Sequence, residues 1–417
     1  TARIVAAIRT QLLRTLRRNR RYYYTPRHFV TVSGMLYRMK QNAAGLASIA
    51  ILCTMAMITL GTTIALYNGS EKTLTEYYPS DMQITMDDQA SQDAVLQRNA
   101  SLAKQTGVTV TDAYAFTAHE VVFALEDGQI LPTSAVSYNS LNEYGKMHDT
   151  LVLSPDMWAM LEGNALTLAP GEVGMWTNAE QKPATLLAGT TQLTVRTISE
   201  LPVVPCSSHG SAITKSILVL PDGDILTAIL DAAAATDTER SPVFTTQWNV
   251  TGDEAQLQQY YSLVNDQTPE WKNHNLRVKD SIRSEWYAMH GGFLFVGIFL
   301  GFVFLMGTAL IIYFKQISEG YQDHDRFIIL QKVGMSADEV RATVRKQIML
   351  VFFLPLAVAV CHVAGSLHMM ILMLQLFGLF DVPYVALNTF GSALGITALY
   401  WLFYHSTAKT YYKMVKF

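Results

Sequence analysis

Residues 291–314 read GGFLFVGIFLGFVFLMGTALIIYF, and these 24 residues include no Asp, Glu, Lys or Arg. A helix needs about 20 apolar residues to cross a hydrocarbon core about 30 Å thick. The stretch Gly291–Phe314 therefore predicts a transmembrane helix. The same criteria, length and absence of charge, apply to the rest of the chain.

Three more stretches pass the same test. Ala43–Tyr67 has 25 residues and Val385–Tyr404 has 20, with no charged side chain in either. Ile348–Phe380 has 33 uncharged residues, more than one straight crossing needs, so the helix predicted over 347–380 should tilt or project from the bilayer. Pro355 lies in its first half and is expected to kink it.

The basic residues predict the orientation of these spans. Residues 1–42 hold ten Lys and Arg and no acid, the loop 315–346 holds six, and the tail 405–417 holds three. Residues 68–290 instead hold 28 acids and 12 bases. Since cytoplasmic segments are enriched in Lys and Arg, both termini are predicted to be cytoplasmic and residues 68–290 to lie outside.

Residues 68–290 alternate short β-like runs with helical ones, which indicates an α+β domain. Its lone Cys206 can form no disulfide within the domain. The predicted fold is an integral membrane α-helical bundle of four transmembrane helices, with a large α+β extracytoplasmic domain inserted between the first and second. The expected strands are Met82–Met86, Val108–Thr111, Val121–Leu125, Leu193–Ile198, Ile217–Leu220 and Val243–Asn249, and the expected helices Ala90–Gln105, Asp224–Ala234 and Asp253–Asp266.

The cytoplasmic segments carry amphipathic patterns. Thr1–Arg21 reads as a basic amphipathic helix suited to anionic lipid, and Phe29–Lys40 as an elbow helix on the inner leaflet. In the loop 315–346, Gly334 is placed to end a helix, and Ser336 with Glu339 has the spacing of a capping box. We expect two short helices joined at this glycine, forming a docking surface for a cytoplasmic protein.

Two features inside the spans could serve packing or function. The pairs Gly297-xxx-Gly301 and Gly391-xxx-Gly395 have the spacing that lets transmembrane helices approach closely, although glycine is also frequent in such helices. His362 and Ser366 lie one turn apart near Pro355, either as a functional polar site or as hydrogen-bonding groups across the bundle.

Several chemistries have no counterpart in the sequence. It contains no Gly-x-x-x-x-Gly-Lys-Ser/Thr phosphate loop, no His-Glu-x-x-His motif and no nucleophile elbow. No Cys/His group has metal-ligand spacing either. The expectation is a chain with no catalytic residue, no metal and no nucleic-acid partner.

Four segments together resemble a known family. They are FVTVSGMLYRMKQNAAGLASI at 29–49, EGYQDHDRFIILQKVGMS at 319–336, the Phe352-Phe-Leu-Pro355 stretch followed by His362, and the closing Tyr411-Tyr-Lys-Met-Val. This set resembles the second permease module of FtsX-like ABC transporters, and within them the bacitracin-exporter (BceB-type) permeases. The resemblance is well supported over the spans and rests on size and position over the outer domain.

The resemblance implies partners and a role. Such permeases work with a separate ATPase dimer, which binds ATP and Mg, and with a membrane histidine kinase in the bacterial cytoplasmic membrane. They confer resistance to peptide antibiotics by freeing undecaprenyl-pyrophosphate-type lipids. Family members have ten spans, so this chain is expected to be the C-terminal part of one. By position, the residues that would couple to the ATPase are Glu319, Gly320, Tyr321, Asp323, Arg326, Phe327, Gly334 and Met335.

Two other readings stay open. A four-span chain with this insertion also describes MacB- and LolE-type subunits, which move peptides or lipoproteins. A signalling protein like the cell-division FtsX proteins would sense a ligand without transporting it.

Overall fold

The computed structural model describes residues 43–136, 145–179, 182–200, 202, 213–267, 271, 275–332 and 336–414. The helices expected over Thr1–Arg21 and Phe29–Lys40 therefore lie outside the described residues, as does Cys206. The chain divides into two compact units. The membrane unit holds the chain up to Tyr67, Gly291–Met370 and the chain from Asp381 onward, and the domain unit holds Asn68–His290 and Ile371–Phe380.

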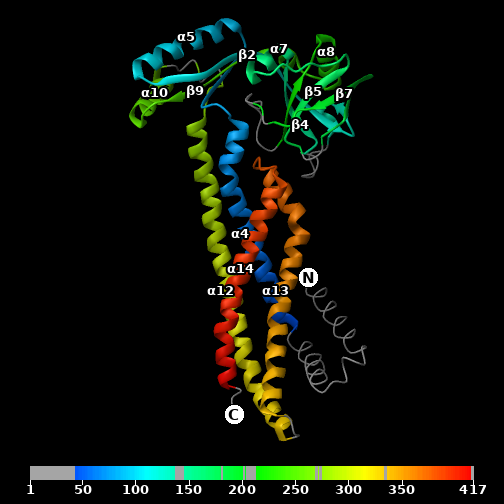
Figure 1. The fold of residues 1–417 in the computed structure, drawn as a ribbon, viewed down its shortest axis with the longest axis vertical. Helices are drawn as coiled ribbons and strands as arrows, with labels where there is room; N and C mark the ends of the chain where they lie inside the picture. The colour runs from blue at the N-terminus through cyan, green and yellow to red at the C-terminus, as the bar shows by residue number, and fades with distance from the viewer. Residues whose placement is uncertain are drawn as a thin grey trace. The chain divides into compact units, whose positions relative to one another are not determined.

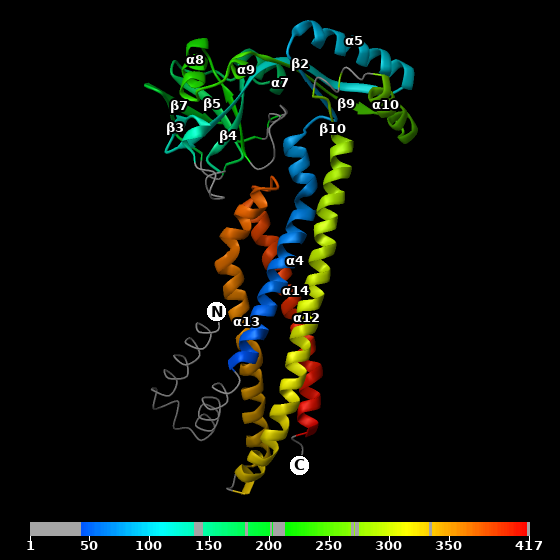
Figure 2. The same cartoon turned by 180° about the vertical axis from the view of Figure 1, so that it is seen from behind.

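In the described chain, four helices are long and apolar enough to cross a membrane, as predicted. They are α4 (Ala43–Tyr77), α12 (Lys279–Lys332), α13 (Ala337–Gln375) and α14 (Val382–Met414), and both views show them side by side in the membrane unit (Figures 1 and 2). A helix satisfies every backbone polar group internally, which a spanning segment requires. With the sheet domain between the first two, the predicted fold class is confirmed.

The core of the membrane unit follows helical periodicity. On α4 the buried positions include Leu46, Ile49 and Cys53, and on α13 they include Leu356 and Val363. Such spacings of three, four or seven residues place side chains on one helix face. The shared core also takes Ile312 from α12 and Ala393, Ile396 and Tyr400 from α14.

The long uncharged run 348–380 has a simple explanation. Helix α13 ends at Gln375, and the remaining residues form the turn before α14 begins at Val382. Backbone hydrogen bonds from Phe377, Gly378 and Leu379 to the last turn of α13 close that helix. Pro355 lies within the helix, which continues through it.

The predicted pair of short cytoplasmic helices is wrong in length. The segment 315–332 is the end of the 54-residue α12, and 337–346 is the start of the 39-residue α13. The helix boundaries at Lys332 and Ala337 still fall on either side of Gly334, which itself lies outside the described residues. The uncharged stretches therefore predict where the helices cross the membrane, but they do not predict that the same helices continue beyond it.

The domain unit is built on one mixed sheet of ten described strands in the order β10-β1-β9-β2-β3-β6-β7-β5-β8-β4. Pairing of β2 with β4 closes the strands from β2 to β4 into a ring, which leaves no free edge between them. The strands are β1 Met82–Met86, β2 Thr109–Glu126, β3 Gln129–Leu131, β4 Met147–Leu153, β5 Glu172–Thr177, β6 Thr185–Ala188, β7 Thr191–Thr197, β8 Thr214–Val219, β9 Val243–Thr251 and β10 Arg277–Val278.

The long strand β2 belongs to both halves of this sheet. Its first part, Thr109–Ala118, pairs with β9, and its second part, His119–Ala124, pairs with β4. The two predicted strands Val108–Thr111 and Val121–Leu125 are therefore the ends of one strand. A bulge between Thr111 and Tyr114 interrupts the pairing, with Asp112 in the left-handed region at φ 49°.

Helices cover the two halves of the domain separately (Figure 1). Near β9 lie α5 (Gln89–Thr106) and α10 (Glu254–Gln267), and near the ring lie α7 (Pro155–Glu162), α8 (Gly223–Ala232) and α9 (Asp237–Arg240). Helix α5 begins where the Asp88 carboxylate accepts from Ser91 N and ends at Gly107, whose φ of 76° suits glycine. A short 3-10 turn, Thr133–Ala135, follows β3.

Candidate functional site

The ends of α4 and α12 that belong to the domain unit are tied to each other. Ser70 Oγ and His290 Nδ1 lie 2.7 Å apart in a buried hydrogen bond. Seven residues before His290 on α12, Arg283 donates to both carboxylate oxygens of Glu71, the residue after Ser70, at 3.0 and 3.3 Å. A bidentate guanidinium–carboxylate pair fixes orientation as well as distance, so these helix ends form a two-helix stem.

The stem joins the sheet with little intervening chain. Helix α4 ends at Tyr77 and β1 starts at Met82, while β10 leads directly into α12 at Lys279. Strands β1 and β10 pair with each other, and Lys279 N donates to Asp81 O at 2.8 Å. Both stem helices are thus anchored in neighbouring strands of one sheet.

A buried ion pair lies beside the end of α4. Lys215 on β8 and Asp149 on β4 are directly opposite in register, and their charged atoms lie 2.5 Å apart with side-chain exposures of 1% and 0%. Lys215 Nζ also lies 5.7 Å from the ring centroid of Tyr77, the last residue of α4. The Tyr77 ring in turn meets Trp286 of α12 edge-on at 6.3 Å. The ring of strands therefore contacts the stem through Lys215.

The same strands hold a neutral network on their other face. His148 Nδ1 lies 2.7 Å from Ser216 Oγ, which donates to Thr177 Oγ1 at 3.1 Å. The His148 ring stacks on Phe123. Burial lowers the pKa of His148 to about 4, because the protein interior disfavours the imidazolium. His148 is therefore neutral at physiological pH.

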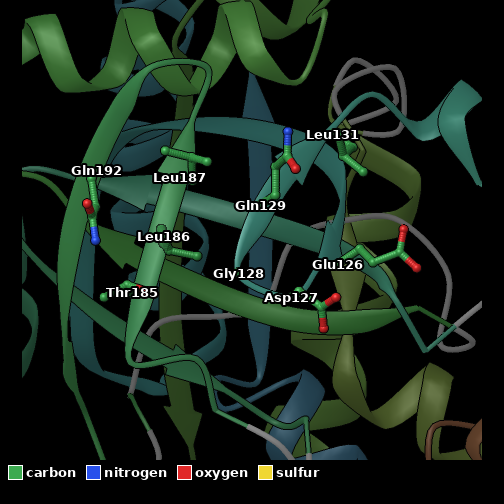
Figure 3. A pocket seen from close by; sticks show the side chains of 9 residues that line it. All are labelled: Glu126, Asp127, Gly128, Gln129, Leu131, Thr185, Leu186, Leu187 and Gln192. Carbon is green, nitrogen blue, oxygen red and sulfur yellow. The ribbon is translucent and has the colours of Figure 1, made fainter.

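A hollow of about 430 Å³ opens beside the β2–β3 turn (Figure 3). Two carboxylates, Glu126 and Asp127, lie on one rim, and the amide of Gln192 lies across the hollow from them. The remaining lining residues are Gly128, Leu131, Thr185, Leu186 and Leu187. The volume falls within the range of small-molecule sites.

The predicted ATPase-coupling residues fall mostly on the last turns of α12. Glu319, Gly320, Tyr321, Asp323, Arg326 and Phe327 are all within this helix, beyond the apolar span that ends at Ser318. Tyr321 is 70% exposed. Gly334 and Met335 lie outside the described residues. The coupling role of this set stays a prediction.

No hydrogen bond joins His362 and Ser366, the two predicted polar residues inside α13. Ser366 Oγ donates to Val363 O of its own helix at 3.0 Å. His362 is half-buried and makes no hydrogen bond with the described residues. Across the bundle, the hydroxyl of Tyr400 instead donates to Phe352 O at 2.8 Å, which ties α14 to α13.

The two glycine pairs have different surroundings. Gly297 and Gly301 face α4, where an added Cβ would collide with Thr63 or lie 2.8 Å from Leu60. An added Cβ at Gly391 or Gly395 would meet no described atom within 4 Å. The first pair therefore lies at a helix contact within this chain, and the second lies on an open face of α14.

A sequence pattern that indicates the buried pair lies in strands β4 and β8. Strands β4 and β8 read MHDTLVL and TKSILV, so each carries one charge of opposite sign within an otherwise uncharged strand. Buried charges are usually paired, which could have suggested that the two strands are neighbours. The stem contacts had no comparable sign, because they join residues more than 200 positions apart.

The chain that carries these features is similar to known proteins. No family model matches the chain. The bacitracin export permease BceB of Halalkalibacterium halodurans is 22% identical over 364 residues, which cover 85% of this chain and 53% of that protein. The chain is a relative of BceB-type permeases. BceB of Bacillus subtilis is 31% identical over 91 residues, 22% of this chain and 14% of that protein.

A third relative is the ABC transporter permease protein YxdM of Bacillus subtilis, 28% identical over 119 residues. That match covers 24% of this chain and 19% of YxdM. The chain spans about half the length of BceB of Halalkalibacterium halodurans. The stem, the buried pair and the hollow therefore belong to a chain related to transporter permeases of the bacitracin export type.

Proposed function

We propose that this chain is part of an ABC transporter permease that protects cells from peptide antibiotics directed at the cell wall. The alignment with BceB over 85% of the chain carries this proposal. Four spans with a large domain between the first and second agree with it. In the proposed orientation both termini are in the cytoplasm of a bacterial cell, and the domain is outside.

The ATPase would dock at the cytoplasmic end of α12. Glu319–Lys332 extends the helix 14 residues past Ser318, a distance of roughly 20 Å at 1.5 Å per residue. ATP and Mg would be bound by the partner ATPase dimer, not by this chain. A test is cysteine cross-linking from positions 327 and 334 to the ATPase. If no cross-link forms in any nucleotide state, this docking surface is wrong.

Movement would pass from α12 to the domain through the stem. Helices α4 and α12 both continue from the membrane unit into the domain unit. The Glu71–Arg283 and Ser70–His290 contacts would keep the two helix ends together. Contacts of Lys215 with Tyr77 and of Tyr77 with Trp286 would then transmit tilting of the stem to the ring of strands.

The proposed output has two parts. The permease would release an undecaprenyl-pyrophosphate-type lipid from the bound peptide, and it would signal transport activity to a membrane histidine kinase. The test is ATP hydrolysis by the protein from the complete reading frame, co-purified in lipid with its ATPase. Peptide and lipid are added alone and together. Stimulation that requires both supports the proposal, and a normal basal rate with no response to either contradicts it.

One variant distinguishes loss of transmission through the stem from failure of the permease to assemble with its ATPase. Arg283→Met removes the bidentate contact with Glu71 from the stem without touching the coupling segment or the hollow. We expect normal basal hydrolysis and normal peptide binding, with loss of the stimulation that peptide and lipid produce together. If Arg283→Met keeps full stimulation, the stem contact has no part in transmission.

A further inference from the structure

The hollow beside the β2–β3 turn has a fixed shape. Asp127 and Gly128 form a two-residue hairpin turn with φ of 48° and 83°, the left-handed pair typical of a type I′ turn. Leu187 N donates to Gly128 O at 2.8 Å, and a Cβ added at Gly128 would lie 2.7 Å from Thr185 O. The turn is thus held closely against β6, and Asp127 has a defined position on the rim.

The two rim carboxylates differ in how they are neutralised. Glu126 Oε1 accepts from Lys146 Nζ at 2.8 Å, and both side chains are partly exposed. Asp127 makes no ion pair and no hydrogen bond with the described residues. Among the described residues, the rim therefore carries one carboxylate with a counter-ion and one without, and the Gln129 amide oxygen in the same lining can also accept hydrogen bonds.

The lining adds an apolar surface to this negative rim. Leu131 of β3 and Leu187 of β6 supply it, and Leu187 is 37% exposed, whereas Leu186 is fully buried in the domain core. Figure 3 shows Leu187 and Gln192 across the hollow from Glu126 and Asp127. A ligand matched to this lining has an aliphatic stem and ends in a cation, since ammonium groups donate to carboxylates while their methylenes cover apolar surface.

We propose that this hollow binds an ammonium-bearing side chain of the transported peptide. The inference rests on the proposed function and names the site and the chemistry of its ligand. The acidic excess of residues 68–290, 28 acids to 12 bases, would also raise the local concentration of a cationic peptide. A peptide whose amines are acetylated keeps its apolar groups and loses the donor that Asp127 binds.

The experiment measures protection of a cysteine inside the hollow. Gln129→Cys is introduced into the full protein with its native cysteines replaced, Cys53, Cys206 and Cys361 among them, and alkylation by N-ethylmaleimide is followed in lipid. Bacitracin should slow alkylation of this cysteine, and acetylated bacitracin should not. A cysteine in place of Ser101 on α5, outside the hollow, should react at the same rate with or without the peptide.

Three variants give the expected directions. Asp127→Asn keeps the turn, since Asn also favours this turn type, and should raise the half-protecting concentration about 3- to 5-fold, as expected for loss of one exposed ion pair. Lys146→Met frees Glu126 and should lower that concentration about 2-fold, because an exposed pair competes only weakly. Asp93→Asn on α5 is the matched control and should leave it unchanged.

Other outcomes would contradict the proposed binding site. Equal protection by acetylated bacitracin, or Asp127→Asn behaving like Asp93→Asn, would show that no ammonium group binds Asp127. Absence of protection in every variant would exclude the hollow as a peptide site. The proposed function is judged separately by stimulation of ATP hydrolysis, which does not depend on position 129.

Discussion

The two units of the molecule differ in the polar groups that they bury. In the described part of the membrane unit the buried polar side chains are few, namely Thr308, Gln316 and Thr389 besides the hydroxyl of Tyr400. The hydroxyls of Thr308 and Tyr400 each donate to a backbone carbonyl. The domain unit buries a complete ion pair, a histidine–hydroxyl network and a Trp248–Tyr260–Asn99 hydrogen-bond chain. Lipid stabilises apolar helices from outside, whereas a water-exposed sheet has neighbouring strands that supply partners for its polar groups.

The largest loss of stability is expected when one partner of the buried ion pair in the domain unit is removed. Lys215→Met leaves Asp149 charged and buried, so the domain should lose about 3–5 kcal/mol of unfolding free energy. Guanidinium unfolding of the full chain, followed by tryptophan fluorescence, measures it. The double change Asp149→Leu with Lys215→Met should recover most of the loss, since no unpaired charge remains. A loss below about 1 kcal/mol for Lys215→Met would contradict burial of the pair.

The pH dependence of the domain should follow His148. Its pKa is near 6.5 when unfolded and about 4 when folded, so between these values the unfolded state binds the extra proton. Stability is fully present above pH 6.5 and should fall by up to about 3 kcal/mol as the pH drops to 4. Unfolding titrations across this range measure the slope. His148→Gln should flatten the slope, and an unchanged slope would assign it to other groups.

A third test compares the two glycine pairs of the membrane unit. Gly297→Leu or Gly301→Leu should cost about 1–3 kcal/mol, because the new side chain meets Thr63 or Leu60 on α4. Gly391→Leu and Gly395→Leu are the matched controls and should be near neutral within this chain. Thermal unfolding in one detergent compares all four. Equal losses at both pairs would mean that α14 is also closely packed.

The smallest effect concerns the hydroxyl that joins α13 and α14. Tyr400→Phe removes the donor to Phe352 O and leaves the ring in place, so we expect a loss of about 1 kcal/mol. The same thermal assay measures it. Tyr313→Phe on α12, whose hydroxyl makes no hydrogen bond with the described residues, serves as the comparison. A loss as large as that of Lys215→Met would show that the membrane core also depends on polar contacts.

Much of the fold was predictable from particular residues. The uncharged runs at 43–67, 291–314 and 385–404 all lie within spanning helices, and the predicted strand Met82–Met86 coincides with β1. The continuation of α12 to Lys332 was missed because charged residues after Phe314 hide a helix that leaves the membrane without ending. The merging of two predicted strands into β2 was missed because a bulge at Asp112 breaks the alternation between them.

Hydropathy, charge and local motifs were enough to predict the four spans, the inserted α+β domain and the resemblance to BceB-type permeases, because neighbouring residues carry these signals. Tertiary structure alone decided that Lys215 meets Asp149 and Tyr77, that Glu71 meets Arg283, and that the β2–β3 turn closes a hollow against β6. These contacts join residues far apart in the chain. Their partners depend on strand order and register, and no local pattern encodes strand order.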